Sequence, residues 1–117
     1  MILVDTSIWI DHFRHRNDAL VARLERGEVA THPFVIGELA LGGLRQTTKA
    51  LALLAELPAC AVVSHADALA LVERRSLAGS GIGWVDAHLL ASALVDRLPL
   101  WTLDRRLAAV ARQLAPM

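Results

Sequence analysis

The sequence predicts an α/β domain in which a central parallel sheet is flanked by helices in three layers. Short apolar segments alternate with longer stretches of helical periodicity along the whole chain. With 117 residues the chain can bury one core but not two, so we expect a single domain over residues 1–117. An apolar content of 55% argues against a disordered chain.

The chain begins with a short strand and two helices. Ile2-Leu3-Val4 is apolar throughout, and Thr6 or Ser7 can cap a helix that continues through Phe13. A second helix is expected over residues 18–26, because its leucine and valine side chains recur three and four residues apart.

The next segments repeat this alternation. Residues 29–31 form a brief apolar strand, and Pro33 suits the first turn of a third helix that Gly42-Gly43 closes. Residues 49–56 continue as a helix, and residues 60–63, which contain two valines, are expected to form a strand.

The second half begins with Ser64 and Asp67, which are spaced as a capping box for a helix that extends through Leu77. A glycine-rich segment at 79–83 follows. The remaining elements are a helix at about 84–95, a strand at 100–102 and a helix at 105–114. Almost no sequence is left for a further edge strand after the last helix.

Four carboxylates, each embedded in apolar sequence, are the candidate functional residues: Asp5, Glu38, Asp86 and Asp104. Asp5 follows the first strand and Asp104 the last, so both project from the carboxyl edge of the sheet, where α/β proteins place functional groups. Asp86 shares a helical stripe with apolar residues and is expected to point toward the sheet, as is Glu38. Two carboxylates about 4 Å apart repel by about 4 kcal/mol at an effective dielectric of 20. A divalent metal ion is the simplest compensation.

Each acid also has a structural explanation when taken alone. Asp5 and Asp104 could cap the helices that follow them, Glu38 could pair with Arg45, and Asp86 could pair with Arg97 or a histidine. The shared apolar context of all four favours a functional cluster.

Four segments in order resemble the motifs of PIN-domain ribonucleases, and within that family the VapC-type toxins of bacterial toxin–antitoxin pairs. The segments are MILVDTS at 1–7, Gly37-Glu38-Leu39, GWVDAHLLA at 83–91 and Thr102-Leu103-Asp104. The resemblance covers nearly the whole chain and keeps the order and approximate spacing of the motifs.

This resemblance implies a PIN-like α/β domain acting as a Mg²⁺- or Mn²⁺-dependent endoribonuclease. Its catalytic and metal-binding acids would be Asp5, Glu38, Asp86 and Asp104, and its steadying hydroxyls Thr6 and Thr102. It further implies a structured RNA substrate of the tRNA or rRNA class, and inhibition by a small cognate antitoxin.

Two details refine the expected metal site. Asp5 and Asp86 are the expected direct ligands, while Glu38 and Asp104 would hold metal-bound waters or a second ion. Many family members carry a further acid one turn after the Asp86 position, where this chain has Leu90. A one-metal site is therefore favoured over a two-metal site.

Charge and composition bound the partners and the setting. The chain has 12 basic and 12 acidic residues; without the four clustered acids, 8 acids face 12 basic residues, a balance of +4 that permits phosphate contacts. We expect neither a signal peptide nor a membrane span, and Cys60 is the only cysteine. A cytoplasmic protein is expected.

The high apolar content also predicts a homodimer, with the helices around residues 9–13 and 44–57 as candidate contacts. A catalytically inactive PIN-like module that binds RNA or protein through the same cleft is the alternative to a nuclease.

Overall fold

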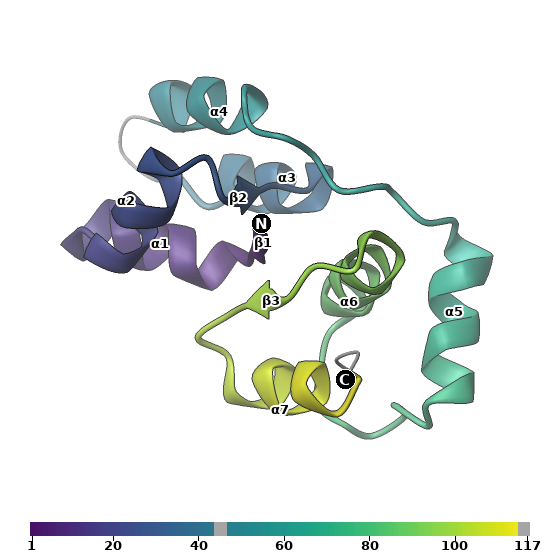
Figure 1. The fold of residues 1–117 in the computed structure, drawn as a ribbon. Coiled ribbons are helices and arrows are strands. Elements are labelled where there is room, and N and C mark those ends of the chain that lie inside the picture. The colour runs from purple at the N-terminus through teal and green to yellow at the C-terminus, as the bar shows by residue number, and fades with distance from the viewer. Residues whose placement is uncertain (44–46, 115–117) are drawn as a thin grey trace.

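The computed structural model describes residues 1–43 and 47–114 of the chain. The predicted α/β class with a parallel sheet is confirmed (Figure 1). In chain order the elements are β1 (Ile2–Val4), α1 (Thr6–His15), α2 (Asp18–Glu25), β2 (Val29–Ala30), α3 (Pro33–Leu41), α4 (Thr47–Ala55), α5 (His65–Arg74), α6 (Trp84–Asp96), β3 (Leu100–Trp101) and α7 (Arg105–Leu114).

The sheet is small and wholly parallel, with strand order β2-β1-β3. Leu3 of the central strand is in register with Ala30 on one side and Leu100 on the other. β1 is covered on both faces, and the side chains of Leu3 and Val4 are fully buried. This burial explains why β1 is an uninterrupted apolar run, and it leaves Asp5 as the first polar residue at the carboxyl end of the central strand.

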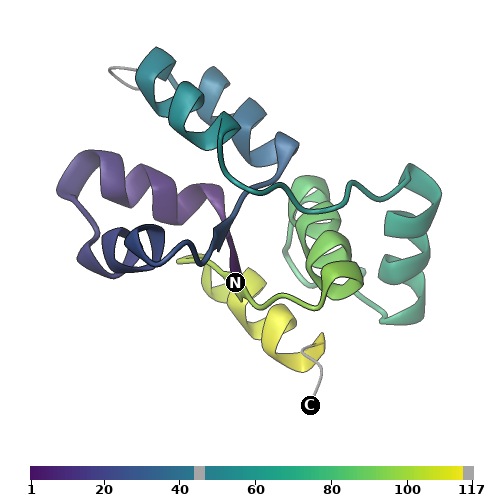
Figure 2. The ribbon, with the colours of Figure 1, turned by 45° about the horizontal axis from the view of Figure 1, so that its top comes forward.

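The helices form two groups around the sheet. Helices α1 to α4 gather around β1 and β2, whereas α6 and α7 lie beside β3, with α5 outermost against α6 (Figures 1 and 2). The main core fills the space between the strands and helices α1, α2, α3 and α6. A smaller apolar cluster joins the end of α5, α6 and α7 through Leu77, Leu90, Leu107, Val110 and Leu114.

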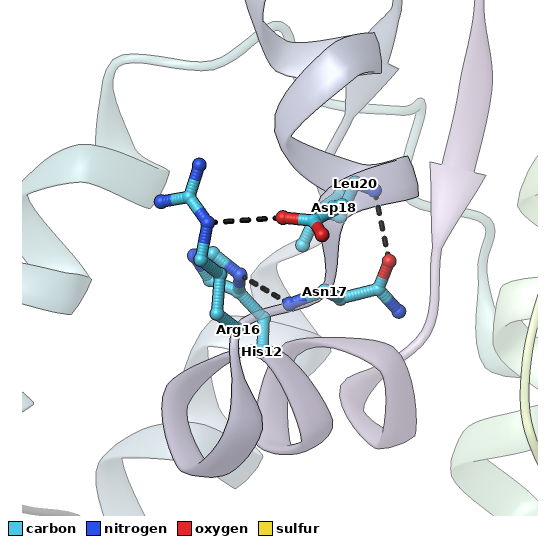
Figure 3. A network of polar contacts seen from close by, with 5 residues as sticks. All are labelled: His12, Arg16, Asn17, Asp18 and Leu20. Carbon is cyan, nitrogen blue, oxygen red and sulfur yellow. Dashed lines mark hydrogen bonds and ion pairs between the residues drawn. The ribbon is translucent and has the colours of Figure 1, made fainter.

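A polar network fixes the turn between α1 and α2 (Figure 3). The side chain of Asn17 caps α2 by accepting the Leu20 amide at 2.9 Å, and the backbone amide of Asn17 donates to Nδ1 of His12 at 3.1 Å. Arg16 pairs with Asp18 at 3.0 Å, but both side chains are largely exposed, so this ion pair adds little stability. The Asn17 cap therefore sets where α2 begins, and α2 then leads the chain back to β2.

The predicted strand at 60–63 is wrong. Pairing is limited to one bridge between Thr31 and Ala59, and the Cys60 amide donates to the Thr31 carbonyl at 2.8 Å. The next amide, that of Ala61, donates instead to the carboxylate of Asp96 at 2.9 Å, which ends the ladder. Cys60 is buried, and burial together with Asp96 raises the pKa of its thiol to about 11, so the thiol stays neutral.

The helix predicted through Leu77 ends earlier, at Arg74, because Ser76 adopts a positive φ of 54° that a helix cannot accommodate. Half of its predicted capping box is present: the Asp67 amide donates to the Ser64 hydroxyl at 3.0 Å, but the return bond from the Ser64 amide to the Asp67 carboxylate is not found among the described residues. The expectation of almost no edge strand after Leu114 and the predicted pairing with Arg45 both fall outside the described residues. None of the described helices is both long enough and apolar enough to cross a membrane.

The first prediction concerns the central strand. Leu3→Ala should lower the free energy of unfolding by about 2–5 kcal/mol, because it opens a cavity between fully buried neighbours. Leu103→Ala is the control: Leu103 is 56% exposed, so the same truncation should change stability by no more than about 1 kcal/mol. Urea denaturation measures both, and equal losses would contradict the assigned core.

Candidate active site

Asp5 lies at the carboxyl end of β1, is 5% exposed and caps α1. The predicted caps Thr6 and Ser7 are wrong, because α1 already begins at Thr6, whereas the alternative that Asp5 caps this helix is correct. All the hydrogen bonds that the Asp5 carboxylate receives from described residues reach one oxygen, Oδ2. They come from the Ser7 hydroxyl at 2.8 Å, the Thr102 hydroxyl at 2.7 Å and, more weakly, the Ser7 amide at 3.4 Å. The carboxylate is thereby held in one orientation.

The two hydroxyls tie Asp5 to the segment that follows β3. Ser7 Oγ accepts the Leu103 amide at 2.9 Å, and Thr102 Oγ1 accepts the Asp104 amide at 3.0 Å. Each hydroxyl has a single proton, so donating it to Asp5 leaves the 3.2 Å contact between the two hydroxyl oxygens without one. Ser7 was not predicted as a site residue, although its place two residues after a helix cap is the signal that could have found it.

Glu38 lies on α3 and accepts a hydrogen bond from the Thr6 hydroxyl at 2.7 Å. Its expected burial against the sheet is wrong, since Glu38 is exposed. The buried stripe of α3 consists of Val35 and Leu39, four residues apart, and Glu38 lies on the flank of that stripe. Glu38 therefore lies at the rim of the site, where the hydrogen bond from Thr6 of α1 holds it.

Contacts between α3 and α6 bring Glu38 toward the first turn of α6. His32 Nε2 lies 3.0 Å from the Ser92 hydroxyl, and the rings of Phe34 and His88 are 4.9 Å apart. These contacts hold the N-terminal end of α3 against the middle of α6. Glu38, one turn after Phe34, comes close enough to Asp86 in the first turn of α6 for its charge to raise the pKa of that carboxyl. Burial, with the charge of His88, lowers the pKa of His32, which favours the neutral ring in this contact.

Asp86, in the first turn of α6, is half-buried and accepts the Gly83 amide at 3.0 Å. Burial raises the pKa of its carboxyl, and the Gly83 hydrogen bond opposes that shift. The negative charges of Asp5, Asp104 and Glu38 raise the same pKa further. Four carboxylates that are distant in sequence therefore act on one another at this edge of the sheet.

Asp104 is exposed and caps α7, with Oδ1 accepting the amides of Arg106 at 2.9 Å and Leu107 at 3.1 Å. The structural explanations of Asp5 and Asp104 as helix caps are thus correct, and both residues still face the cluster. A carboxylate that caps a helix keeps lone pairs for other partners.

The donor set fits a hard cation. Carboxylate oxygens converge from β1, α3, α6 and the start of α7, and Mg²⁺ is commonly held by one or two carboxylates with waters completing the octahedron. Within residues 1–43 and 47–114, no three His, Cys, Asp or Glu side chains lie close enough together to hold one ion directly. Two direct ligands, with the other acids acting through water, match this arrangement.

A known protein family matches the chain from β1 to α7. Residues 2–113 match the family model of the PIN domain. The chain belongs to the PIN-domain family. Ribonuclease VapC32 of Mycobacterium tuberculosis is 53% identical over 110 residues, in strain CDC 1551 / Oshkosh and in strain ATCC 25618 / H37Rv alike. The aligned region covers 93% of this PIN domain and 89% of each relative. The predicted resemblance to PIN-domain, VapC-type proteins is confirmed.

The second prediction follows from the raised pKa of Asp86. A carboxyl whose pKa is higher in the folded chain than in the unfolded one favours folding at low pH. That contribution is lost as the pH rises from the ordinary aspartate pKa of about 4 through the higher pKa of the folded chain. At neutral pH and in EDTA, Asp86→Asn should therefore melt at a higher temperature than the wild type, since the amide can still accept the Gly83 hydrogen bond. The advantage should shrink below pH 4. A lower melting temperature at pH 7 would contradict this reading of the cluster.

Proposed function

We propose that this protein is a Mg²⁺- or Mn²⁺-dependent endoribonuclease of the VapC toxin type. The observation that carries the proposal is the convergence of Asp5, Glu38, Asp86 and Asp104, whose charges act on a single carboxyl at the edge of the sheet. A relative named as a ribonuclease, 53% identical over 93% of the chain, supports the reaction class.

In this proposal the residues have distinct roles. Asp5 and Asp86 are direct metal ligands, the first fixed by two hydroxyls and the second by the Gly83 amide. Glu38 and Asp104 hold metal-bound waters or a second ion, and orient the attacking water. When bound, the metal polarises the scissile phosphate and supplies a water that loses its proton near neutral pH.

Thr6 and Thr102 position these acids. Thr6 donates to Glu38 at 2.7 Å, and Thr102 donates to Asp5 at 2.7 Å while accepting the Asp104 amide. Each hydroxyl therefore fixes the orientation of a carboxylate and leaves its other oxygen for a cation.

We also propose the finer points of the toxin assignment. The substrate is a structured RNA of the tRNA or rRNA class, and a small cognate antitoxin inhibits the enzyme by directing a basic side chain at the four acids. The protein acts in the cytoplasm as a homodimer. Trp9 is fully buried and cannot contribute to a dimer contact, whereas Leu41 of α3 and Leu53 of α4 are 90% and 44% exposed on neighbouring helices. These two helices are the better candidates for the dimer contact.

The third prediction concerns the metal. Mn²⁺ or Mg²⁺ should raise the melting temperature of the protein, because a ligand that binds only the folded state adds about 2.7 kcal/mol at a concentration one hundred times its Kd. Asp5→Asn should abolish most of this shift. Protein stripped with EDTA and then dialysed should show no change at millimolar metal if the assigned site is wrong.

The fourth prediction concerns catalysis. Asp5→Asn and Asp86→Asn should lower the rate of RNA cleavage by orders of magnitude, since each change removes a ligand charge while preserving the shape of the side chain. Asp67→Asn on α5 is the control: it keeps the backbone amide that Ser64 accepts and should leave activity intact. Cleavage of purified tRNA and rRNA provides the assay.

The catalytic variants also separate the two candidate functions. Growth arrest on expression should disappear with Asp5→Asn and Asp86→Asn, while antitoxin binding persists. If wild-type protein reloaded with Mn²⁺ binds RNA and leaves it intact, the inactive binding module is the correct function.

A further inference from the structure

Arg106 lies directly on the backbone of Gly81. A Cβ atom added to this glycine would come within 2.6 Å of Arg106 Cδ, 2.8 Å of Nη1 and 3.1 Å of Nε. Gly81 also has a φ of +87°, which side-chain-bearing residues rarely adopt. A side chain at position 81 would therefore push the end of the arginine side chain away from its present place.

This contact bridges two of the segments that build the acid cluster. Arg106 belongs to the first turn of α7, and its amide donates to Asp104 at 2.9 Å. Gly81 belongs to the segment that leads to Gly83, whose amide donates to Asp86 at 3.0 Å. The arginine side chain thus reaches from the helix that Asp104 caps to the approach of the helix that carries Asp86. It lies at the rim of the site.

The acids of the cluster do not neutralise the guanidinium of Arg106. The ion pairs found among residues 1–43 and 47–114 all lie elsewhere, in and next to α1 and α2: Arg16–Asp18, Arg23–Glu28 and Arg26–Glu28. The charges that shift the pKa of Asp86 come from three carboxylates, and within the described chain no arginine offsets them. Arg106 is exposed, so its planar set of N–H donors is open to a ligand.

We propose that Arg106, which lies against Gly81, binds a phosphodiester group of the RNA strand that enters the acidic site. This inference rests on the proposed function. A site lined with four carboxylates repels a polyanion, and cations at its rim are needed to bring the backbone of the substrate close. A guanidinium can donate two parallel hydrogen bonds to one phosphate, and a side chain already laid against the backbone loses less freedom on binding than a free one.

The fifth prediction tests the charge of Arg106. The probe is a short fluorescein-labelled single-stranded RNA of mixed sequence, bound in EDTA so that it stays intact and titrated at several salt concentrations. Arg106→Gln should weaken binding and reduce the slope of log affinity against log salt by about 1, as expected for one lost phosphate contact. Arg106→Lys should restore the slope but only part of the affinity, because an ammonium cannot form the bidentate pair.

Arg105 provides the matched control. It is an exposed arginine in the same first turn of α7, so Arg105→Gln removes the same charge from the neighbouring position. We expect its salt slope to stay close to that of the wild type. Equal slopes for Arg105→Gln and Arg106→Gln would overturn the assignment of a defined phosphate contact.

A pair of glycine variants tests the placement of the arginine without removing it. Gly79 and Gly81 have φ values of +78° and +87°, so alanine strains the backbone at both positions, but a Cβ at Gly79 meets nothing within 4 Å. Gly81→Ala should displace Arg106 and weaken RNA binding toward the level of Arg106→Gln, while Gly79→Ala retains it. Thermal melts establish that each variant is folded, and if Gly81→Ala fails to fold the arginine variants decide alone.

Cleavage kinetics separate this inference from the proposed function. With Mn²⁺, Arg106→Gln should raise KM severalfold more than it lowers kcat. If the wild type cleaves RNA and Arg106→Gln keeps its KM and salt slope, the inference fails and the nuclease stands. If the wild type binds RNA through Arg106 but does not cleave it, the nuclease fails and the inference stands. A wild type that neither binds nor cleaves RNA overturns both.

Discussion

Mutual repulsion among carboxylates at the end of a buried strand is the constraint around which this PIN domain is arranged. Asp5 lies where the chain leaves the core at the end of β1. Its charge is tolerated there because the hydroxyls of Ser7 and Thr102 donate hydrogen bonds to its carboxylate. Asp86 has the Gly83 amide and Asp104 has the first amides of α7. Each carboxylate is thus stabilised locally by N–H or O–H dipoles. These dipoles carry no net charge, so they do not cancel the combined negative charge of the cluster. A cation can supply that remaining compensation.

The acid cluster also requires that elements far apart in sequence meet at one edge of the sheet. The sheet brings Asp5 and Asp104 together, since β1 and β3 are adjacent and parallel. Glu38 is brought there in a different way, by the contacts of α3 with α6 and by the hydrogen bond from Thr6. The contact between the rings of Phe34 and His88 thereby helps to determine where the Glu38 carboxylate lies.

The part of the site that follows strands could be predicted from sequence, because the exit point of a strand is a local property. Asp5 and Asp104 were placed correctly for this reason. The orientation of Glu38 could not be predicted, since it depends on which flank of α3 meets α1. The strand predicted at 60–63 is wrong because the valines near Cys60 have strand propensity but no strand to pair with. The contact of Arg106 with Gly81 is likewise invisible in sequence, because it arises only when α7 docks beside the loop before α6.

β3 is two residues long, yet the residues that follow it, Thr102 and Asp104, both belong to the site. Its attachment to β1 includes the amides of Leu3 and Asp5, which donate to the carbonyls of Pro99 and Trp101 at 3.0 and 2.9 Å. Detachment of so short an edge strand is a sub-global opening that requires far less free energy than unfolding of the whole domain. Hydrogen–deuterium exchange at the Leu3 and Asp5 amides would therefore report how often the acidic cluster comes apart in a molecule that is otherwise folded.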